Sequence, residues 1–369
     1  KPDVFVMDDW GEGSYTFRCE RTGKYMNTRM GQSDKESSET GWIAAEKDAP
    51  FDWFVMEIFH VLEQGNGMIQ LTNRFHSPVE IDEKDFLVSM REGSAAQFRM
   101  EIVENGLEKA CSLVQGKEKV ILALGCNSMI NAKEEVDRTT IALPPAQEHL
   151  LEEIYRINPN VILVLFSNYP YSINMAQEKL PAVLWSATGS QDMGTAMAET
   201  LFGKNAPAGR LNMTWYRSDE QLPDIDDYDI IKGKRTYRYF DGDILYPFGY
   251  GLTYSSFTYT DFSAAPEDNR KLRVSFCVTN TGDRVSDEVA QIYGTAPASR
   301  VKKPIKQLLG FRRLKGILPG ETRKAEFMIS IEEFRFYDVI SRTMMVEEGC
   351  YRIFAGPSSA PPPREAFGG

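Results

Sequence analysis

Hydrophobic and polar positions alternate along the first hundred residues, and this period-two pattern predicts short β-strands. The alternation runs through Tyr15, Phe17 and Cys19, and turns containing glycine follow at 22–23 and 65–67. No long helical pattern interrupts these short runs. We therefore expect a β-rich domain over residues 1–99.

From about residue 100 the pattern changes to buried strands separated by amphipathic helices. The apolar runs KVILAL (119–124) and VILVLF (161–166) are typical of strands buried on both faces. Pro144 and Pro145 open a helix that places Leu151 and Ile154 on one face. The remaining predicted elements are strands at 100–103 and 181–185 and helices at 106–115, 175–180 and 192–202. This alternation predicts an α/β domain over 100–255, built on a mainly parallel sheet that is covered on both faces.

After residue 255 the pattern returns to short strands. They are predicted at 272–278, 288–293, 323–329 and 350–355, with turns around Gly282 and Gly320. Strands of this length with regular turns indicate a small β-sandwich over 256–358. The last residues, 359–369, contain three consecutive prolines and are expected to form a tail.

Charge and cysteine content narrow the classes of function. The chain has 42 Lys and Arg against 53 Asp and Glu, a formal net charge of -11, which repels phosphate backbones and argues against a nucleic-acid partner. No apolar run approaches the roughly 20 residues of a membrane helix, so no membrane partner is expected. The five cysteines are odd in number, scattered and without CxxC spacing, which favours a reducing, cytoplasmic location.

Several motifs that suggest other chemistry are incomplete. His60, His76 and His149 lie far from any second ligand at metal-binding spacing, so no metal is expected. The glycine-containing run 189–194 lacks the lysine of a phosphate loop and is better explained as a turn before a helix. Ser190 lacks the GxSxG pattern of a serine hydrolase. We expect neither a cofactor nor a nucleotide.

A set of ordered motifs resembles glycoside hydrolase family three. From Gly125 the chain runs GCNSMINAKEEVDRTTIALPPAQEHLLEEIYRINPNVILVL, which is similar to the second domain of these enzymes. The resemblance continues through TYRYF (236–240) and YPFGYGLTY (246–254) into a fibronectin type III-like domain that contains LGF (309–311). It covers roughly residues 100–358. The catalytic barrel of the family, with its nucleophilic aspartate, has no counterpart in this sequence.

The resemblance implies a retaining, exo-acting β-glycosidase, with β-glucosidase as the expected type. Such an enzyme uses two carboxyl groups about 5 Å apart, one as nucleophile and one as general acid/base. The resemblance implies that the missing barrel carries the nucleophile and that Glu134, four positions before Arg138, is the acid/base. Glu135 is the alternative because a shift of one residue is easy in a loop of variable length. Asp137 and Arg138 are expected to be structural.

The residues themselves are compatible with more than one role. Glu134 follows a buried strand, where ligands collect in α/β sheets, but two adjacent glutamates are commonly solvated loop charges. A non-catalytic carbohydrate-binding or scaffold protein with the same fold is the rival to the enzyme. For either function, the expected partners are a carbohydrate and the missing barrel. A homo-oligomer is also compatible with the sequence.

Aromatic residues provide a second set of candidates for sugar binding. Trp10, Trp42, Trp53, Tyr15 and Tyr25 of the first domain either form a sugar-binding surface or fill a small core, and the core is the favoured role. The aromatic loop 246–254 similarly suggests a sugar platform, but a loop that holds two domains together accounts for it better.

Overall fold

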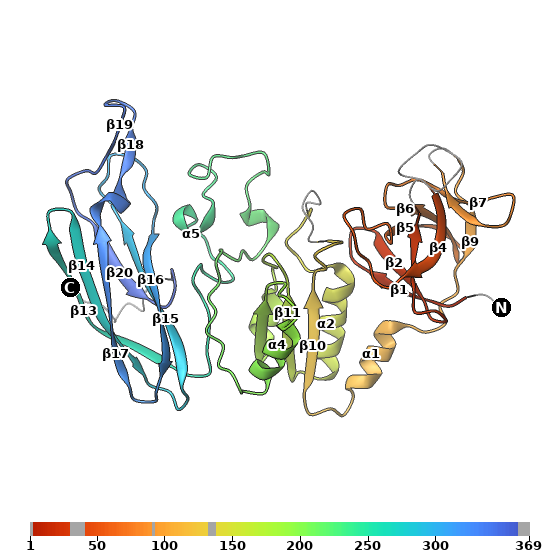
Figure 1. The fold of residues 1–369 in the computed structure, drawn as a ribbon, viewed down its shortest axis with the longest axis horizontal. Helices are drawn as coiled ribbons and strands as arrows, with labels where there is room; N and C mark the ends of the chain where they lie inside the picture. Colours follow the sequence, from red (N-terminus) through yellow and green to blue (C-terminus); the bar gives the residue numbers. More distant parts are fainter. Residues whose placement is uncertain (1–2, 30–40, 91–92, 132–137, 361–369) are drawn as a thin grey trace. The chain divides into compact units, whose positions relative to one another are not determined.

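The computed structural model describes residues 3–29, 41–90, 93–131 and 138–360. The chain divides into two compact units, Lys1–Tyr169 with Ile173–Thr188, and Pro170–Ser172 with Gly189–Gly369 (Figure 1). Each unit has its own elements and is described separately. No helix of the described ranges is long and apolar enough to cross a membrane.

The first unit begins with a curled antiparallel sheet (Figure 1). Its strands follow the order β7-β8-β4-β3-β2-β5-β6-β9, and β1 pairs with β2. The inward-facing residues form an apolar core that includes Phe17, Phe59 and Leu71. The β-rich prediction is therefore confirmed. The strands are β1 (Phe5–Asp9), β2 (Ser14–Cys19), β3 (Tyr25–Thr28), β4 (Gly41–Lys47), β5 (Phe59–Gly65), β6 (Met68–Asn73), β7 (Val79–Ile81), β8 (Leu87–Ser89) and β9 (Gln97–Arg99).

Two histidines that are distant in sequence stack on this sheet. The rings of His60 and His76 lie parallel, with centroids 4.2 Å apart, so the two are not isolated as the sequence spacing suggested. Nδ1 of His60 lies 3.0 Å from the carbonyl oxygen of Gly13. Burial lowers the pKa of His60 below its ordinary value of 6.5, and the nearby His76 adds to this effect.

The second half of this unit is a three-stranded parallel sheet with helices. The elements are α1 (Gly106–Val114), β10 (Val120–Gly125), α2 (Pro145–Ile157), β11 (Val161–Phe166), α3 (Asn174–Lys179) and β12 (Ala182–Ser186). On one face Val120 and Val161 pack with Ile154 of α2. The prediction of a strand at 100–103 is wrong, because this segment is irregular. Its residues Ile102 and Val103 are 70% and 73% exposed, respectively.

The end of β10 lies unusually close to β11. Gly125 has φ +141°, and a Cβ atom placed there would lie 1.8 Å from the carbonyl oxygen of Phe166. Only glycine fits this position. On the other side of β10, the Gln147 amide accepts from the Gly125 N–H at 2.9 Å and donates to its carbonyl oxygen at 2.8 Å. This pair of hydrogen bonds holds the strand end against α2.

The second unit contains a helix, an irregular connector and a β-sandwich. The elements are α4 (Met193–Leu201), η1 (Asp219–Gln221), α5 (Thr236–Tyr239), β13 (Phe257–Asp268), β14 (Lys271–Asn280), β15 (Ser286–Thr295), β16 (Gln307–Ile317), β17 (Thr322–Ser330), η2 (Ile331–Phe334), β18 (Phe336–Asp338), β19 (Thr343–Met345) and β20 (Arg352–Gly356). The sheets β13-β14-β17 and β16-β15-β20 are antiparallel. The predicted β-sandwich is thus present.

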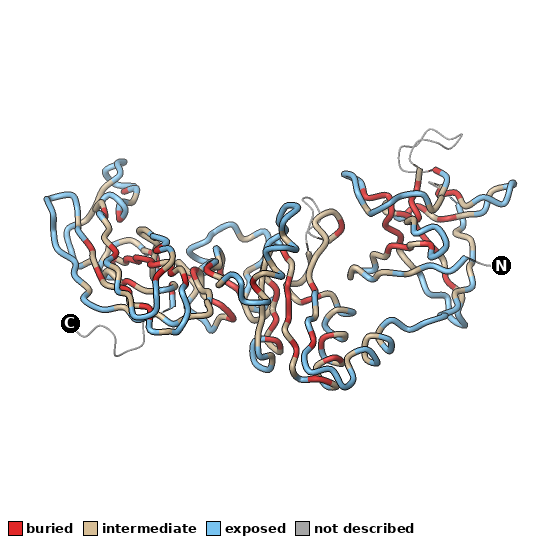
Figure 2. Tube along the Cα trace, turned by 60° about the horizontal axis from the view of Figure 1, so that its bottom comes forward, coloured by how far each residue is buried: buried red, intermediate tan, exposed pale blue. Residues whose placement is uncertain are grey.

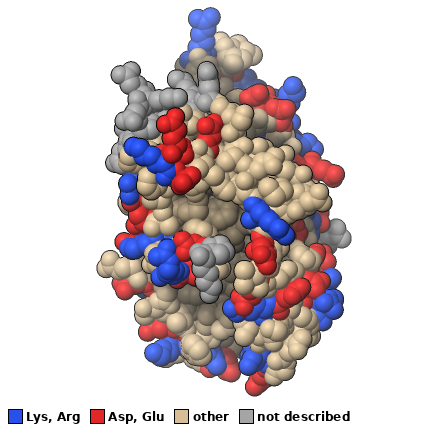
Figure 3. Space-filling model, turned by 90° about the vertical axis from the view of Figure 1, so that its right-hand side faces the viewer, with Lys and Arg blue, Asp and Glu red and all other residues tan. Residues whose placement is uncertain are grey.

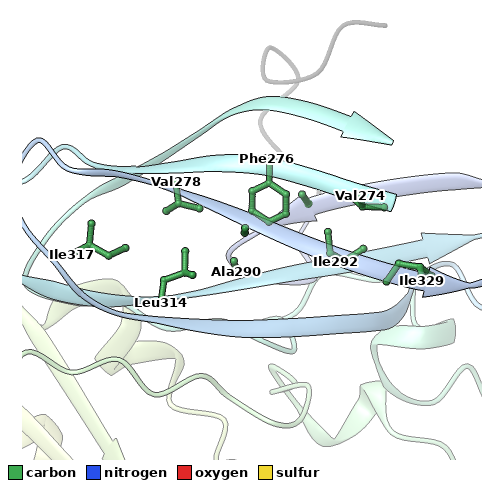
Figure 4. Close-up of a cluster of buried hydrophobic side chains, with 10 residues drawn as sticks. Val274, Phe276, Val278, Ala290, Ile292, Leu314, Ile317 and Ile329 are labelled. Atoms are coloured by element: carbon green, nitrogen blue, oxygen red, sulfur yellow. The ribbon is translucent and has the colours of Figure 1, made fainter. Parts of the chain in front are cut away.

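The sandwich core and a buried ion pair hold this unit together. Phe276 and Ile292 are among the buried side chains that lie between the two sheets (Figure 4). Arg210, which follows α4, donates to Glu288 of β15 at 2.8 Å, with both side chains less than a tenth exposed (8% and 3%). The Tyr259 hydroxyl donates to the same carboxylate at 2.7 Å. The connector is therefore attached to the sandwich by a desolvated polar network.

We expect the first unit to lose stability in mild acid through His60. Its pKa is depressed in the folded state, so the neutral ring contributes fully above about pH 6.5, and that contribution is lost as the pH falls below this value. His60→Asn keeps a donor for the Gly13 carbonyl but cannot titrate. In urea unfolding followed by tryptophan fluorescence, the wild-type chain should lose more stability between pH 7.5 and 5.5 than the variant. Equal losses would contradict the role of His60.

We also expect Gly125→Ala to destabilise the first unit by about 2 kcal/mol or more, since the added methyl group meets backbone atoms of β11. Gly106→Ala is the matched control, because a Cβ atom there meets nothing within 4 Å. The control should change stability by no more than about 0.5 kcal/mol. Urea unfolding measures the stability of both variants. Equal losses of stability would show that the close approach of Gly125 to β11 does not restrict this position to glycine.

Candidate functional site

The three parallel strands of the first unit end at the same level. Gly125 pairs with Phe166, and Phe166 pairs with Ser186. The residues that follow these three positions therefore meet at the carboxyl edge of the sheet. Ligands of open α/β sheets bind at this edge, so the segments 126–131, 167–169 and 187–188 form the candidate site.

The segment after β10 is a compact turn held by two asparagines. The Asn127 side-chain oxygen accepts from the Met129 N–H at 2.8 Å, and the Asn127 N–H donates to the Asn131 side-chain oxygen at 2.8 Å. The Asn131 side-chain nitrogen then donates to the carbonyl oxygen of Trp10 at 2.9 Å. Hydrogen bonds between asparagine side chains and the backbone thus take the place of helix or strand hydrogen bonds in this turn.

The β-rich domain packs directly against this turn. Ile130 is 2% exposed and lies in a small apolar cluster with Val55 and Ile58. Glu12 accepts from both the N–H and the hydroxyl of Thr139, at 3.1 and 2.8 Å. The wall of the candidate site is therefore formed jointly by the two halves of the first unit.

Tyr169, three residues after the end of β11, contacts both flanks of the segment 132–137. Its hydroxyl donates to the carbonyl oxygen of Asn131, on one side of that segment. On the other side, the Arg138 guanidinium carbon lies 3.4 Å from the centroid of the Tyr169 ring, a cation–π contact. The described residues on either side of 132–137 therefore both contact Tyr169 at the sheet edge.

The predicted acid/base lies within that segment. Glu134, its alternative Glu135 and Asp137 are outside the described residues. Arg138 is described and makes the cation–π contact with Tyr169, and its structural role stays a prediction. The structure thus shows that both residues flanking 132–137 contact Tyr169. The assignment of Glu134 as the acid/base stays a prediction.

Tyr169 is itself held by the ends of β11 and β12. The Ser167 hydroxyl donates to the carbonyl oxygen of Tyr169 at 2.8 Å and accepts from Trp185 Nε1 at 2.9 Å. The side-chain oxygen of Asn168 accepts from the Thr188 N–H at 3.1 Å. Sequence reasoning did not single out Tyr169 as a site residue. The signal that could have found it is its position three residues after a buried strand.

The aromatic candidates of the β-rich domain divide into two groups. Trp10 and Tyr15 are partly buried against apolar clusters, as a core role requires, and Tyr25 is also partly buried. Trp42 and Trp53 are 40% and 47% exposed and contribute little to the core.

The aromatic loop 246–254 is packed within the second unit. Tyr246 is 8% exposed, stacks on Tyr250 and makes an edge contact with Trp215. Burial raises the pKa of its hydroxyl to about 12. The Tyr254 hydroxyl donates to the Thr200 carbonyl oxygen at the end of α4, at 2.8 Å. These contacts favour a domain-connecting role over a sugar platform.

Side chains that commonly bind metals do not cluster in the described parts of the chain. No group of three His, Cys, Asp or Glu side chains comes together among them. On the face drawn in Figure 3, basic and acidic side chains are interspersed with uncharged ones.

Two family profiles match the chain. The Glycosyl hydrolase family 3 C-terminal domain matches residues 10–254, and the fibronectin type III-like domain matches residues 288–359. The first match begins well before residue 100, where the sequence motifs of the resemblance begin. The β-rich domain thus falls largely within the matched range.

Curated proteins and solved structures agree with these profiles. The chain is 38% identical over 224 residues to a xylan 1,4-beta-xylosidase of Xylanibacter ruminicola, covering 60% of this chain and 25% of that protein. It is 32% identical over 256 residues to a periplasmic beta-glucosidase of Salmonella typhimurium, covering 65% and 33%. The crystal structure of a beta-D-glucoside glucohydrolase from Trichoderma reesei superposes with a TM-score of 0.64 at 26% identity, covering 69% and 40%.

The chain spans only a quarter to two fifths of the length of these three proteins. The first profile nevertheless extends over most of the sequence, and the second covers most of the β-sandwich. The chain therefore belongs to glycosyl hydrolase family 3, of which it carries the C-terminal domain and the fibronectin type III-like domain.

Proposed function

We propose that this chain is the C-terminal part of a retaining, exo-acting β-glycosidase and that it supplies the general acid/base, Glu134. The observation that carries the proposal is the double contact of Tyr169 with Asn131 and Arg138. A catalytic carboxyl group must be held close to its productive position, and attaching both flanks of its segment to one side chain at the sheet edge restricts the positions it can reach.

The proposed chemistry divides the two carboxyl groups between two domains. A carboxylate of a barrel outside this chain attacks the anomeric carbon, while Glu134 gives its proton to the glycosidic oxygen of the leaving group. In the second step the Glu134 carboxylate takes a proton from water, and that water displaces the barrel carboxylate from the sugar. Retention follows because the anomeric carbon is inverted twice.

The proposed substrate is a neutral terminal β-linked sugar, either glucose or xylose. Relatives of both kinds are found, a beta-xylosidase among those with higher identity and beta-glucosidases among the others. The two sugars differ in one hydroxymethyl group, and a pocket distinguishes them by filling or leaving that space. Nitrophenyl β-glucoside and β-xyloside compared on the longer polypeptide would decide between them.

The rival is a non-catalytic carbohydrate-binding protein with the same fold. It needs no carboxyl pair, so it predicts sugar binding without turnover when a barrel is present. All five cysteines are free, which supports a proposed cytoplasmic location.

We expect the isolated chain to have no measurable glycosidase activity, because it lacks the nucleophile of the covalent step. In the polypeptide that includes the barrel, Glu134→Gln should reduce turnover of poor leaving groups by at least about 100-fold. A dinitrophenyl glycoside should still react in the first step because its leaving group needs no proton. Added azide should restore turnover of this substrate, because the anion attacks the covalent sugar intermediate without a general base and releases the barrel carboxylate.

Glu135→Gln is the matched control and should leave the leaving-group dependence unchanged. If only Glu135→Gln showed the selective loss, the acid/base would be Glu135. If both variants slowed activated and unactivated substrates equally, the chain would not provide the acid/base. Turnover of an aryl glycoside by the isolated chain would contradict the division of the two carboxyl groups.

We expect Tyr169→Phe and Tyr169→Leu to impair acid catalysis in increasing order. The first removes the hydrogen bond to Asn131 and keeps the ring beneath Arg138, whereas the second removes both contacts. In the barrel-containing polypeptide, kcat for a poor leaving group should fall about 10-fold and then about 100-fold. The dinitrophenyl glycoside should be affected much less. Equal losses on both substrates would indicate a purely structural role for Tyr169.

A further inference from the structure

The second unit contains a large groove beside its β-sandwich. The groove has a volume of about 1270 Å³ and is lined mainly by residues of the ranges 250–259, 295–306 and 352–360, all within this unit. Figure 2 shows the buried residues of the unit gathered inside the sandwich, with intermediate and exposed segments around them. The groove is thus separate from the candidate site of the first unit.

The floor of the groove is a sheet face that points away from the sandwich core. Thr295 of β15 pairs with Arg352 of β20, so their side chains lie on the same face. Ile353 and Ala355 belong to the sandwich core. Because side chains alternate along a strand, Arg352 and Phe354 point to the opposite face, together with Thr295.

Cations stand on both sides of Thr295. Lys306 immediately precedes β16, whose first residue, Gln307, pairs with Gly294. Lys306 therefore lies next to Thr295 on one side, and Arg352 lies next to it on the other. Adjacent strands are about 4.8 Å apart, so the backbones of the two cationic residues are roughly 10 Å apart.

The walls of the groove carry a large excess of positive charge. Glu288 is the one acidic side chain among the described residues that line it, and Arg210 and the Tyr259 hydroxyl already bind its carboxylate. The formal net charge of the whole chain is -11, so this local excess opposes the overall balance. The cationic side chains that line the groove are Arg210, Arg300, Lys302, Lys303, Lys306 and Arg352.

Some of these cations are already used within the protein. Arg300 forms ion pairs with Asp338 and Glu347, both at 3.0 Å. Lys303 donates to the carbonyl oxygen of Phe334 at 2.7 Å. These two side chains therefore hold the wall of the groove in place.

Lys302, Lys306 and Arg352 have no carboxylate partner in the described part of this unit. Lys306 donates to the carbonyl oxygen of Ser359, and burial lowers the pKa of its ammonium group. The pKa of Asp241 is lowered by its hydrogen bond to Lys234 and, to a smaller extent, by the charge of Lys302. The carboxylate of Asp241 is thus bonded to a different lysine.

We propose that this groove binds a carbohydrate chain that carries carboxylate groups, such as an oligosaccharide of uronic acids. Carboxylates on separate sugars pair with Lys306 and Arg352, and the positive charge of Lys302 adds to the attraction. The ring of Phe354, on the same face as Arg352, provides an apolar surface for a sugar ring.

The choice of occupant follows from size and from pairing. The volume exceeds the roughly 300–1,000 Å³ of a typical small-molecule site, which favours several linked rings over one small anion. A peptide commonly binds a sheet by adding a strand at an open edge, but β15 is paired on both sides. The choice of a carbohydrate over another acidic polymer rests on the proposed function, whereas the negative charge of the ligand does not.

Titration calorimetry of the whole chain with hexagalacturonate and with neutral xylohexaose tests the proposal. Hexagalacturonate should bind at least about 10-fold more tightly at low salt, and its affinity should fall as sodium chloride is added, because salt screens the charges. Equal affinities for the two sugars, or no binding of hexagalacturonate, would overturn the proposal.

Charge removal inside and outside the groove provides the matched comparison. Arg352→Gln and Lys302→Gln change exposed side chains and should each weaken hexagalacturonate binding by about 10-fold while leaving the melting temperature unchanged. Lys204→Gln removes the same charge from an exposed position of this unit that does not line the groove, and should leave the affinity unchanged. Equal effects of the three substitutions would show that the sugar is attracted by general charge and would overturn the proposal.

Other acidic ligands are compared in the same assay. Polyglutamate and inorganic phosphate should each bind at least about 10-fold more weakly than hexagalacturonate. If either bound as tightly and lost affinity in Arg352→Gln, the groove would be a site for an acidic peptide or a small anion, and the proposal would be wrong. All of these measurements use binding to this chain, whereas the role of Glu134 is measured as turnover by the longer polypeptide, so failure of one proposal is distinguishable from failure of the other.

Discussion

The candidate site depends on the in-register ending of three parallel strands. Hydrogen bonding between β10, β11 and β12 places Gly125, Phe166 and Ser186 side by side, so three loops distant in sequence leave the sheet together. The close approach of Gly125 to β11 and the two hydrogen bonds from Gln147 keep β10 in this register. A shift of one residue would turn every side chain of β10 to the opposite face.

Around this edge the structure relies on polar side chains that bond to backbone. Asn127 and Asn131 shape the turn after β10, and Tyr169 binds the carbonyl oxygen of Asn131. Such bonds satisfy loop backbone groups that no strand or helix satisfies. They also connect the β-rich domain to the sheet, through the Asn131 bond to Trp10. The β-rich domain is thereby part of the wall of the site.

The second unit uses different physical means. Its sandwich is held by an apolar core, and the connector joins it through a desolvated Arg210–Glu288 pair with a tyrosine hydroxyl on the same carboxylate. Removing one partner of such a pair leaves an uncompensated buried charge, which is strongly destabilising. The aromatic loop 246–254 packs in the same region, which accounts for its composition without a role in sugar binding.

Local patterns along the chain were sufficient for the order and type of most elements, but not for which residues meet. Period-two alternation predicted the β-rich domain, apolar runs predicted β10 and β11, and the family resemblance covered the segment from Gly125 onward.

Strands β13 and β16 were not predicted. Much of β13 is polar and exposed, and β16 carries arginines and lysine on an exposed stretch, so neither has a clear apolar pattern. The prediction of a strand at 100–103 was wrong. A short apolar run gives the same pattern whether or not a neighbouring strand is there to pair with it. The stacking of His60 on His76 and the contacts of Tyr169 with two flanks both depend on pairing between distant segments. Each segment has its own preference for helix or strand. The register between strands, the connections across the sheet and the burial of one element by another arise only when the segments pack together.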